Sequence, residues 1–346
     1  MSEVLISREG ALGHIRLNRP KAINALSLDM VRAISDALTG FAQDAGIAAV
    51  LMTGEGERGL CAGGDIRALY EHRGAGTAFG LEFFREEYRM NAQIAAFPKP
   101  YIAIMDGITM GGGVGISAHG SVRVVTERTR LAMPETGIGF FPDIGASWLL
   151  ARAPGELGTY LALTGESIGG ADAILAGLAD YFVAGNKLGA LRETLACLPQ
   201  GAGKQEIIAA IHSLCEHSSA TLAAHLEEIN HNFCFDDAKQ IQAALEQADS
   251  DFARQTLNVL SQKSPTGMQV ALRLLRLAKT SRTLEVCLQR EYAACAQILT
   301  GTDFYEGVRA AVVDKDRRPK WQPSSLAEVT EEQISAYFVP AGAQLF

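Results

Sequence analysis

The sequence predicts an α/β layered fold over roughly the first 185 residues, followed by a region that is almost entirely helical. Short apolar runs typical of buried strands alternate with segments of helical periodicity up to that point. Beyond it, amphipathic segments follow one another, and no Gly/Ser-rich linker sets them apart. We therefore expect a core that carries the site at 1–185 and a helical region at 186–346 that packs on it.

The first part begins with two short strands and then alternates between helix and strand. Residues 4–10 and 13–18 are typical of the strands of a hairpin. Segment 27–42 has an N-cap candidate in Ser27 or Asp29 and apolar residues at helical spacing, which predicts a helix. The other elements expected here are strands at 48–54, 100–106, 121–127 and 130–133, a loop at 55–65, and a helix at 79–97 that ends before Pro98.

The second part is predicted to be a succession of amphipathic helices. Each segment repeats apolar residues three or four positions apart, and Pro265 and Pro319 mark breaks. The expected helices lie at 187–198, 206–217, 221–233, 236–248, 250–262, 267–278, 283–299 and 304–313.

Composition excludes several classes of function. Of the 346 residues, 48% are apolar, so the chain can bury a sizeable core. The net charge is −8 and the one basic run is short, at 314–320, so we do not expect a nucleic-acid partner. An anionic substrate would instead need a local basic patch.

No segment is typical of membrane insertion or secretion. The longest apolar runs are shorter than the roughly 20 residues of a spanning helix, so we expect no membrane partner. The N-terminal residues lack a charged-then-apolar signal pattern, and we expect a cytoplasmic protein. The six cysteines form no CxxC pair and are expected to be reduced, buried thiols.

Two glycine clusters suggest chemistry on an acyl carbonyl. CAGGD at 61–65 and the triple glycine Gly111–Gly113 each follow an apolar, strand-like run. Glycine lets the backbone approach a ligand closely, and bare N–H groups can hold a developing oxyanion. The N–H groups of Gly64 and Gly112 are therefore candidate donors of an oxyanion hole, with two ordinary glycine turns as the alternative.

Two carboxylates come soon after the triple glycine. Glu135 and Asp143 each follow a proline, in a segment whose glycines and prolines disfavour a regular helix. Loop carboxylates are usually solvated and inert, but the neighbours of these two are mostly apolar. Apolar surroundings disfavour the charged form and raise basicity, which suits an acid, base or nucleophile.

Other motifs are weaker. GEGERG at 54–59 opens no helix, and GAGK at 201–204 lacks the spacing of a P-loop, so both are interpreted as turns or loops. Ser117 and His119 do not lie in a G-x-S-x-G elbow. No metal site is expected, because the candidate ligands scatter over different helix faces. Those ligands are His212, Cys215, His217, His225, His231 and Cys234.

The chain resembles the crotonase (enoyl-CoA hydratase/isomerase) superfamily and, within it, the 3-hydroxyisobutyryl-CoA hydrolases. The resemblance extends over almost the whole chain, and the combination of motifs is highly specific. The segments that carry it are LNRPKAINALSLDM, CAGGDIRALYE, FFREEYRMN, KPYIAIMDGITMGGGVGISAHG, AMPETGIGFFPDIGASW, LALTG, KSPTGMQVALRLL and DFYEGVRAAVVDKDRRPKW.

The resemblance implies a spiral of ββα turns with a helical C-terminal region, and hydrolysis of a CoA thioester in valine catabolism. It implies that Gly64 and Gly112 donate to the oxyanion and that Glu135 and Asp143 are catalytic acids that also contact the substrate. It further implies a substrate contact by Glu87 and a CoA nucleotide resting on backbone near Ala25 and Ala62. No cofactor is expected beyond the CoA of the substrate. Relatives form trimers or dimers of trimers, so a homo-oligomer is possible.

One position departs from the hydratases of the superfamily. Their triple glycine is followed, two residues on, by a glutamate that helps to add water, and here that place is Gly115. Glu135 with Asp143 suits acyl transfer to water better, with Glu135 as nucleophile or as general base. The alternatives are an enoyl-CoA hydratase or isomerase and a non-catalytic acyl-CoA-binding protein. The acyl group, 3-hydroxyisobutyryl or the smaller 3-hydroxypropionyl, stays open because one methyl group changes binding by only ~1–3 kcal/mol.

Overall fold

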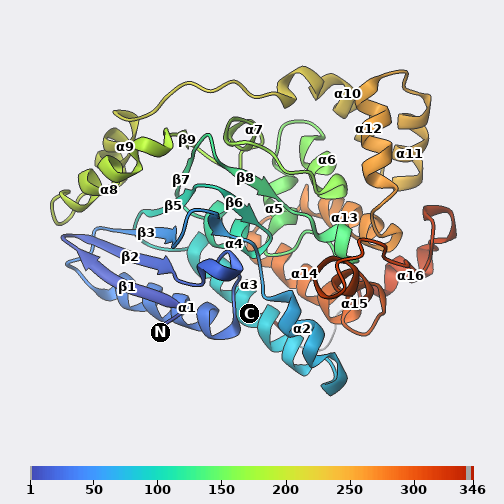
Figure 1. Ribbon diagram of the computed structural model, residues 1–346, viewed down its shortest axis with the longest axis horizontal. Coiled ribbons are helices and arrows are strands. Elements are labelled where there is room, and N and C mark those ends of the chain that lie inside the picture. Colours follow the sequence, from blue (N-terminus) through green and yellow to red (C-terminus); the bar gives the residue numbers. More distant parts are fainter. Residues whose placement is uncertain (1, 340–343) are drawn as a thin grey trace. The chain divides into compact units, whose positions relative to one another are not determined.

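The computed structural model describes residues 2–339 and 344–346, which form two compact units, each assembled from three segments of the chain (Figure 1). The first unit comprises Met1–Gly64, Arg89–Ala132 and Ser167–Thr221. The second comprises Asp65–Tyr88, Met133–Glu166 and Leu222–Phe346. The predicted border at residue 185 follows secondary structure, since every strand in the described part of the chain lies before it. The borders of the compact units lie elsewhere, because the chain alternates between the two.

The first unit contains two sheets. The larger has the strand order β1-β2-β3-β5-β7-β9, in which β1 and β2 are antiparallel and all later pairs are parallel. Its strands are β1 Val4–Glu9, β2 Leu12–Leu17, β3 Ala49–Gly54, β5 Tyr101–Met105, β7 Val122–Val125 and β9 Tyr181–Phe182. The smaller sheet is parallel, in the order β4 Gly59–Cys61, β6 Ile108–Met110 and β8 Arg130–Ala132.

Apolar side chains of the larger sheet pack against helices of the same unit. Strands β2, β3, β5 and β7 contribute Leu12, Leu51, Ile102 and Val124, which are almost fully buried together with residues of α8 and α9. Burial of this kind is the main favourable contribution to folding. The helices that lie entirely in this unit are α1 Leu28–Gln43, α4 Gly112–Ala118, α7 Gly170–Leu175, α8 Leu188–Ala196 and α9 Lys204–His212.

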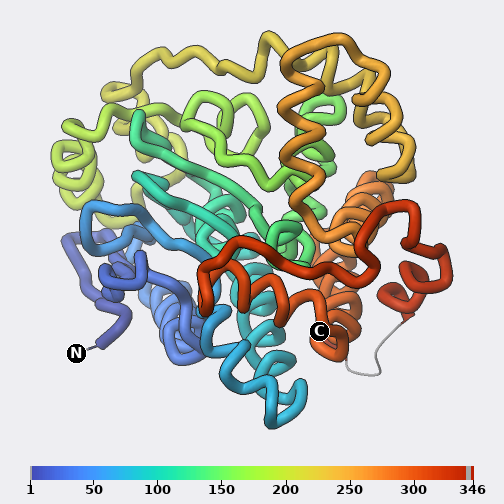
Figure 2. The backbone as a smooth tube through the Cα atoms, turned by 45° about the vertical axis from the view of Figure 1, so that its right-hand side comes forward, coloured from blue at the N-terminus to red at the C-terminus, as the bar shows by residue number. Residues whose placement is uncertain are grey.

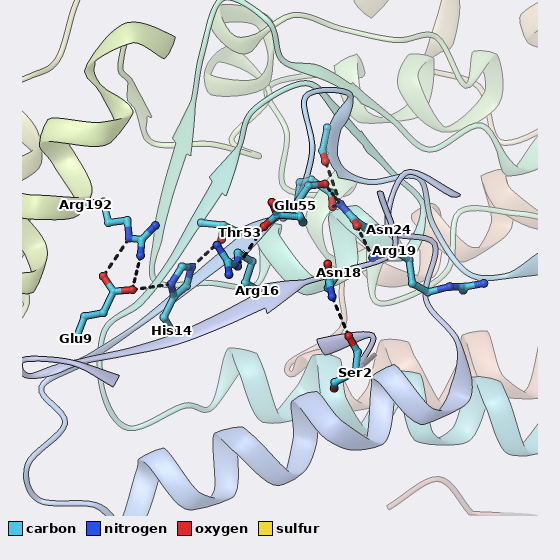
Figure 3. A network of polar contacts seen from close by, with 12 residues as sticks. Ser2, Glu9, His14, Arg16, Asn18, Arg19, Asn24, Thr53, Glu55 and Arg192 are labelled. Atoms are coloured by element: carbon cyan, nitrogen blue, oxygen red, sulfur yellow. Dashed lines mark hydrogen bonds and ion pairs between the residues drawn. The ribbon is translucent and has the colours of Figure 1, made fainter. Parts of the chain in front are cut away.

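A buried histidine connects the larger sheet to α8. Figure 3 shows His14 of β2 between Thr53 and Glu9. Its Nε2 atom lies 2.7 Å from the Thr53 hydroxyl, and its Nδ1 atom lies 3.3 Å from a carboxylate oxygen of Glu9. Arg192 of α8 donates from Nε to the same Glu9 carboxylate at 3.0 Å. Burial lowers the pKa of His14, because the charged ring would lose its hydration. The network therefore fixes α8 to the sheet through neutral and ionic contacts.

The second unit is helical. Within it α13 packs against α5, α6 and α14, and α11 lies beside α12 (Figure 2). Side-chain caps begin several of these helices, for example Ser264, whose hydroxyl accepts from the Gly267 N–H at the start of α13. Its helices are α2 Ile66–His72, α5 Ala146–Leu150, α6 Leu157–Thr164, α10 Leu226–Phe233, α11 Ala238–Gln247, α12 Asp251–Leu260, α13 Pro265–Ala278, α14 Leu284–Ile298, α15 Asp303–Val308 and α16 Glu331–Ala336. Helix α3, Ala78–Ala95, begins in this unit and ends in the first.

Most predicted elements are confirmed, including the hairpin, the helix that ends before Pro98 and the helical succession after residue 185. The loop predicted at 55–65 is wrong in part, because β4 lies within it. The helix predicted at 206–217 ends at His212, and the last turn of the one predicted at 304–313 is a π-helix over Arg309–Val313. The expectation of buried thiols is wrong for Cys197 and Cys234, which are exposed.

Candidate active site

Two glycine-rich segments of the first unit lie against each other, and we call Gly63–Gly64 and Gly111–Gly113 the glycine loops. A Cβ atom added to Gly63 would lie 3.6 Å from the N atom of Gly112. A Cβ atom on Gly113 would lie 2.4 Å from the Cys61 carbonyl oxygen, so only glycine fits there without a backbone shift. Among the residues that the structure describes, no acceptor is found for the N–H of Gly64 or Gly112.

The backbone stretch that includes Ala25 is hydrogen-bonded to the first glycine loop. The N–H of Ala62 donates to the Ile23 carbonyl at 2.9 Å, and the N–H of Leu26 donates to the Gly63 carbonyl at 2.9 Å. Asn24 secures this stretch, because its amide donates to three backbone carbonyls, those of Glu55, Gly59 and Leu60 (Figure 3). The structure thus brings together four of the predicted site residues, Ala25, Ala62, Gly64 and Gly112.

The remaining predicted residues, Glu87, Glu135 and Asp143, form an acid cluster within the second unit. Glu135 begins a 3-10 turn, Glu135–Ile138, and Asp143 lies in the loop that leads to α5. All three side chains are buried, with exposed fractions of 2%, 7% and 5%. The turn is held by the Thr136 hydroxyl, which donates to the Leu163 carbonyl at 3.1 Å.

Burial changes the protonation behaviour of the acid cluster. It raises the pKa of Asp143 to about 7, although the hydrogen bond from Tyr88 acts in the opposite direction. Burial also raises the pKa of Glu135 and of Glu87, and the negative charge of Asp143 adds to both effects. Lys263 opposes the rise at Glu135 through its positive charge. The cluster therefore holds carboxyl groups that can exchange protons near neutral pH.

Two carboxylate oxygens of the acid cluster have no hydrogen-bond partner among the described residues. They are Oε1 of Glu87 and Oε2 of Glu135, and both are buried. Most buried polar atoms in proteins have a hydrogen-bond partner, so two carboxylate oxygens without one call for an explanation. Free acceptors in an apolar environment are suited to receive a proton or a polar substrate group.

The loop of Asp143 is anchored by residues distant in sequence. The Tyr88 hydroxyl donates to Oδ2 of Asp143 at 2.7 Å. Two residues farther along, the Gly145 N–H donates to Glu291 at 2.6 Å, and the Ser147 N–H donates to the same carboxylate at 3.0 Å. The Ser147 hydroxyl is a third donor to it. Glu291 of α14 thus caps the start of α5 and fixes the backbone that carries Asp143.

Comparison with known proteins places the chain in a family. The family model described as enoyl-CoA hydratase/isomerase matches residues 12–338. The chain belongs to this family. It is 43% identical to the 3-hydroxyisobutyryl-CoA hydrolase, mitochondrial, of Rattus norvegicus, and the match covers 99% of this chain and 90% of the relative. The protein of the same name from Homo sapiens is 42% identical over 99% of this chain and 89% of its own length. The predicted superfamily and hydrolase subfamily are confirmed.

Solved structures of the family confirm the predicted fold class. A carnitinyl-CoA dehydratase from Mycobacterium thermoresistibile is similar with a TM-score of 0.95 and 43% identity, covering 100% of this chain and 99% of that one. An enoyl-CoA hydratase from Rhodobacter sphaeroides 2.4.1 is similar with a TM-score of 0.90 and 39% identity, covering 99% of this chain and 98% of that one.

Sequence reasoning missed the residues that support the acid cluster of this family member. Tyr88 directly follows Glu87 in the segment FFREEYRMN. Its position next to a predicted site residue could have indicated its role. Glu291 occupies a position on α14 where the spacing from Leu284, Leu288 and Ile298 predicts an apolar residue. A carboxylate on the apolar face of a helix is a signal for a buried polar contact. Lys263 had no comparable signal.

Proposed function

We propose that the chain hydrolyses 3-hydroxyisobutyryl-CoA to 3-hydroxyisobutyrate and CoA. Two findings support this proposal: near full-length similarity to relatives with that name, and a buried acid cluster in which Asp143 has a pKa of about 7. The unpaired, buried Oε2 atom of Glu135 is the single observation that carries it. An acceptor left free in this way is available to the reacting carbonyl or to a water molecule.

We assign Glu135 the central role. Its carboxylate either attacks the thioester carbonyl, forming a mixed anhydride as the CoA thiolate leaves, or takes a proton from a water molecule that attacks the same carbon. In the first case water then cleaves the anhydride and regenerates the carboxylate. Asp143 orients the water and exchanges a proton with it, which its pKa of about 7 favours. Glu87 contacts the acyl end of the substrate.

The N–H groups of Gly64 and Gly112 are proposed to stabilise the oxyanion that develops from the thioester oxygen. Their lack of a partner among the described residues supports this role. Loss of one such donor typically costs about 10²–10³ in rate. The backbone near Ala25 and Ala62 is proposed to contact the CoA moiety.

Glu135→Gln should abolish release of free thiol from 3-hydroxyisobutyryl-CoA, and Asp143→Asn should reduce it strongly. Circular dichroism and thermal unfolding of both variants establish whether they still fold. Near wild-type turnover by two folded variants would refute the assignment. A single turnover in ¹⁸O-labelled water, followed by mass analysis of the peptide that contains Glu135, distinguishes attack from base catalysis. Label in the carboxylate indicates the anhydride.

Enoyl-CoA hydration is the second candidate, because two solved structures of similar fold bear hydratase and dehydratase names. Gly115 argues against it, since no carboxylate is available at that position. Crotonyl-CoA absorbance and thiol release, measured on one sample, separate the two reactions. Binding of CoA with neither reaction would favour the non-catalytic alternative.

Four further expectations stay proposals. The chain needs no cofactor beyond the CoA of its substrate, which activity after exhaustive dialysis against a chelator would test. It is located in the cytoplasm, although the curated relatives carry the word mitochondrial in their names; cell fractionation tests this. It can form a homo-oligomer, which light scattering tests, and no nucleic-acid partner is expected. No helix among the described residues is long and apolar enough to cross a membrane.

A further inference from the structure

Lys263 of the second unit lies against the turn that carries Glu135. It directly precedes Ser264, the N-cap of α13. The Ser264 N–H donates to the Thr136 carbonyl at 2.9 Å, so the backbone of this segment is hydrogen-bonded to the residue that follows Glu135. A Cβ atom added to Gly137, in the same 3-10 turn, would lie 3.7 Å from Nζ of Lys263. The ammonium group is therefore held beside the main chain of this turn.

The ammonium group of Lys263 has no ion-pair partner among the described residues. The lysines that form ion pairs there are Lys187 and Lys279. Lys263 is half-buried, and it lines a cavity of about 740 Å³ together with Gly137, where water can hydrate the ammonium group. Burial lowers the pKa of Lys263, whereas the negative charges of Glu166 and Glu135 raise it. Both carboxylates thus favour the charged form of the lysine.

The charges that act on Glu135 have opposite effects. Burial and the negative charges of Asp143 and Glu87 raise its pKa and so disfavour the carboxylate form. A hydrogen bond from its own backbone and the positive charge of Lys263 lower the pKa. The Oε2 atom of Glu135 receives no hydrogen bond from the described residues, so the distant charge of Lys263 has few competitors in stabilising the carboxylate.

The other charged groups around the turn and around Lys263 are bound to one another or line cavities. Helices α6, α13 and α15 pack against the turn. In α13, Arg273 pairs with Glu331, and Arg276 pairs with Glu156 and Asp236. In α15, Glu306 pairs with Arg309, and Asp303 accepts from the Ser264 hydroxyl and the Gln322 N–H. After α6, Glu166 accepts from the Tyr160 hydroxyl. The other titratable residues that line cavities with Lys263 are Glu246, Arg317, Arg318 and Lys320.

We propose that Lys263 is a positioning residue for the reaction: its ammonium group, held beside the turn without an ion-pair partner, supplies the counter-charge that lets Glu135 react as a carboxylate. This inference rests on the proposed function, because it takes Glu135 as the nucleophile or the general base. Both roles need the ionised form, since a protonated carboxyl group can neither attack a carbonyl nor accept a proton from water. Lys263 acts through Glu135 alone.

The first experiment compares pH profiles of thiol release. Lys263→Met keeps a long apolar stem and removes the charge. The acid limb of kcat/KM, which reports the ionisation of the coupled acids, should move to higher pH by roughly one unit, because an opposite charge nearby lowers the pKa of an acid by about 1–3 units. The rate of Lys263→Met should therefore recover at alkaline pH. Lys263→Arg keeps the charge and should keep the wild-type profile.

Lys204→Met is the matched control, since it removes the same charge from an exposed lysine at the start of α9. Its profile should coincide with that of the wild type. A folded Lys263→Met with its acid limb in the wild-type position would overturn the proposal. A loss of rate that is equal at every pH would overturn it too, because that is the result of a purely structural role. If thermal unfolding shows that Lys263→Met does not fold, Lys263→Gln is measured in its place with the same expected shift.

Titration of Glu135 itself separates this inference from the proposed function. The full chain is labelled with glutamate that carries ¹³C in its side-chain carboxyl group, and the signal missing from Glu135→Gln is assigned to Glu135. In Lys263→Met the midpoint of this signal should move to higher pH by roughly one unit, as the acid limb does. Absence of thiol release from every protein, with the midpoint still displaced, would refute the function and leave the counter-charge standing. An undisplaced midpoint would overturn the inference, whether or not the chain hydrolyses the thioester.

Discussion

The glycine loops and the acid cluster are built by opposite means. The glycine loops use main-chain atoms, and their shape depends on the absence of side chains at Gly63 and Gly113 and on strand-like hydrogen bonds such as that from Leu26 to Gly63. The acid cluster uses side chains, and it buries carboxyl groups whose charged forms lose hydration. The first therefore tolerates no added atoms, whereas the second tolerates no loss of its polar supports.

The largest effect is expected where a support of the acid cluster is removed. Glu291→Ala leaves the N–H groups of Gly145 and Ser147 and the Ser147 hydroxyl without their acceptor. A buried donor that is left without an acceptor costs about 1–3 kcal/mol, so the free energy of unfolding should fall by at least about that amount. Urea unfolding measures it, with the exposed Glu285→Gln on the same helix as control. Equal stability of both variants would show that the cap on α5 is dispensable.

The pH dependence of stability tests the desolvated carboxyl of Asp143. Its folded-state pKa, about 7, lies above its ordinary value of 3.8, so the folded protein retains a proton that the unfolded chain releases. The corresponding stabilisation is fully present below about pH 4 and is lost as the pH rises through 7. Asp143→Asn should reduce the fall in the free energy of unfolding between pH 5 and pH 8, by up to about 1.4 kcal/mol per pH unit.

Glu328→Gln is the control for this pH measurement. Hydrogen bonds from the Ser324 N–H and from serine hydroxyls lower the pKa of Glu328, so its contribution is lost only as the pH falls below the ordinary range of a glutamate. Its substitution should leave the slope between pH 5 and pH 8 as in the wild type. An unchanged slope in Asp143→Asn as well would mean that Asp143 is not desolvated as described.

Gly113→Ala tests the packing of the glycine loops. The new Cβ atom would meet the Cys61 carbonyl oxygen at 2.4 Å, and overpacking of this kind costs roughly 1–3 kcal/mol. Thiol release should fall because Gly112 shifts with its neighbour. Gly40→Ala in α1 is the control, since no atom lies within 4 Å of its added Cβ and alanine favours a helix by up to about 1 kcal/mol. Thermal unfolding should therefore move in opposite directions for the two variants.

The smallest effect is expected on the pH profile of kcat/KM. Tyr88→Phe removes the hydrogen bond that lowers the pKa of Asp143, so this pKa should rise, by roughly one to two units. The acid limb of kcat/KM should move to higher pH by the same amount. Tyr101→Phe removes a buried hydroxyl that donates to the Ile116 carbonyl at 2.8 Å, and it should leave the profile in place. A parallel shift in both variants would point to a general loss of stability.

Local patterns were sufficient for the elements that are long or strongly periodic. The helix at 27–42 was predictable because Ser27 caps it and its apolar residues recur at helical spacing. The strands β4, β6 and β9, of two or three residues each, were not predicted, although β8, which also has three residues, was predicted at 130–133. Pairing with neighbouring strands decides such elements, and periodicity carries too little information over so few positions.

The sequence by itself determined which atoms are available for chemistry: the glycines at 63, 64 and 111–113, and the acids Glu135 and Asp143. Only the tertiary structure decided how those acids titrate, because burial and contacts with Tyr88 and Lys263 set their pKa values. It alone also gave Asp143 the distant support of Glu291. Residue types are a property of the chain, whereas desolvation and pairing depend on what folding brings near them.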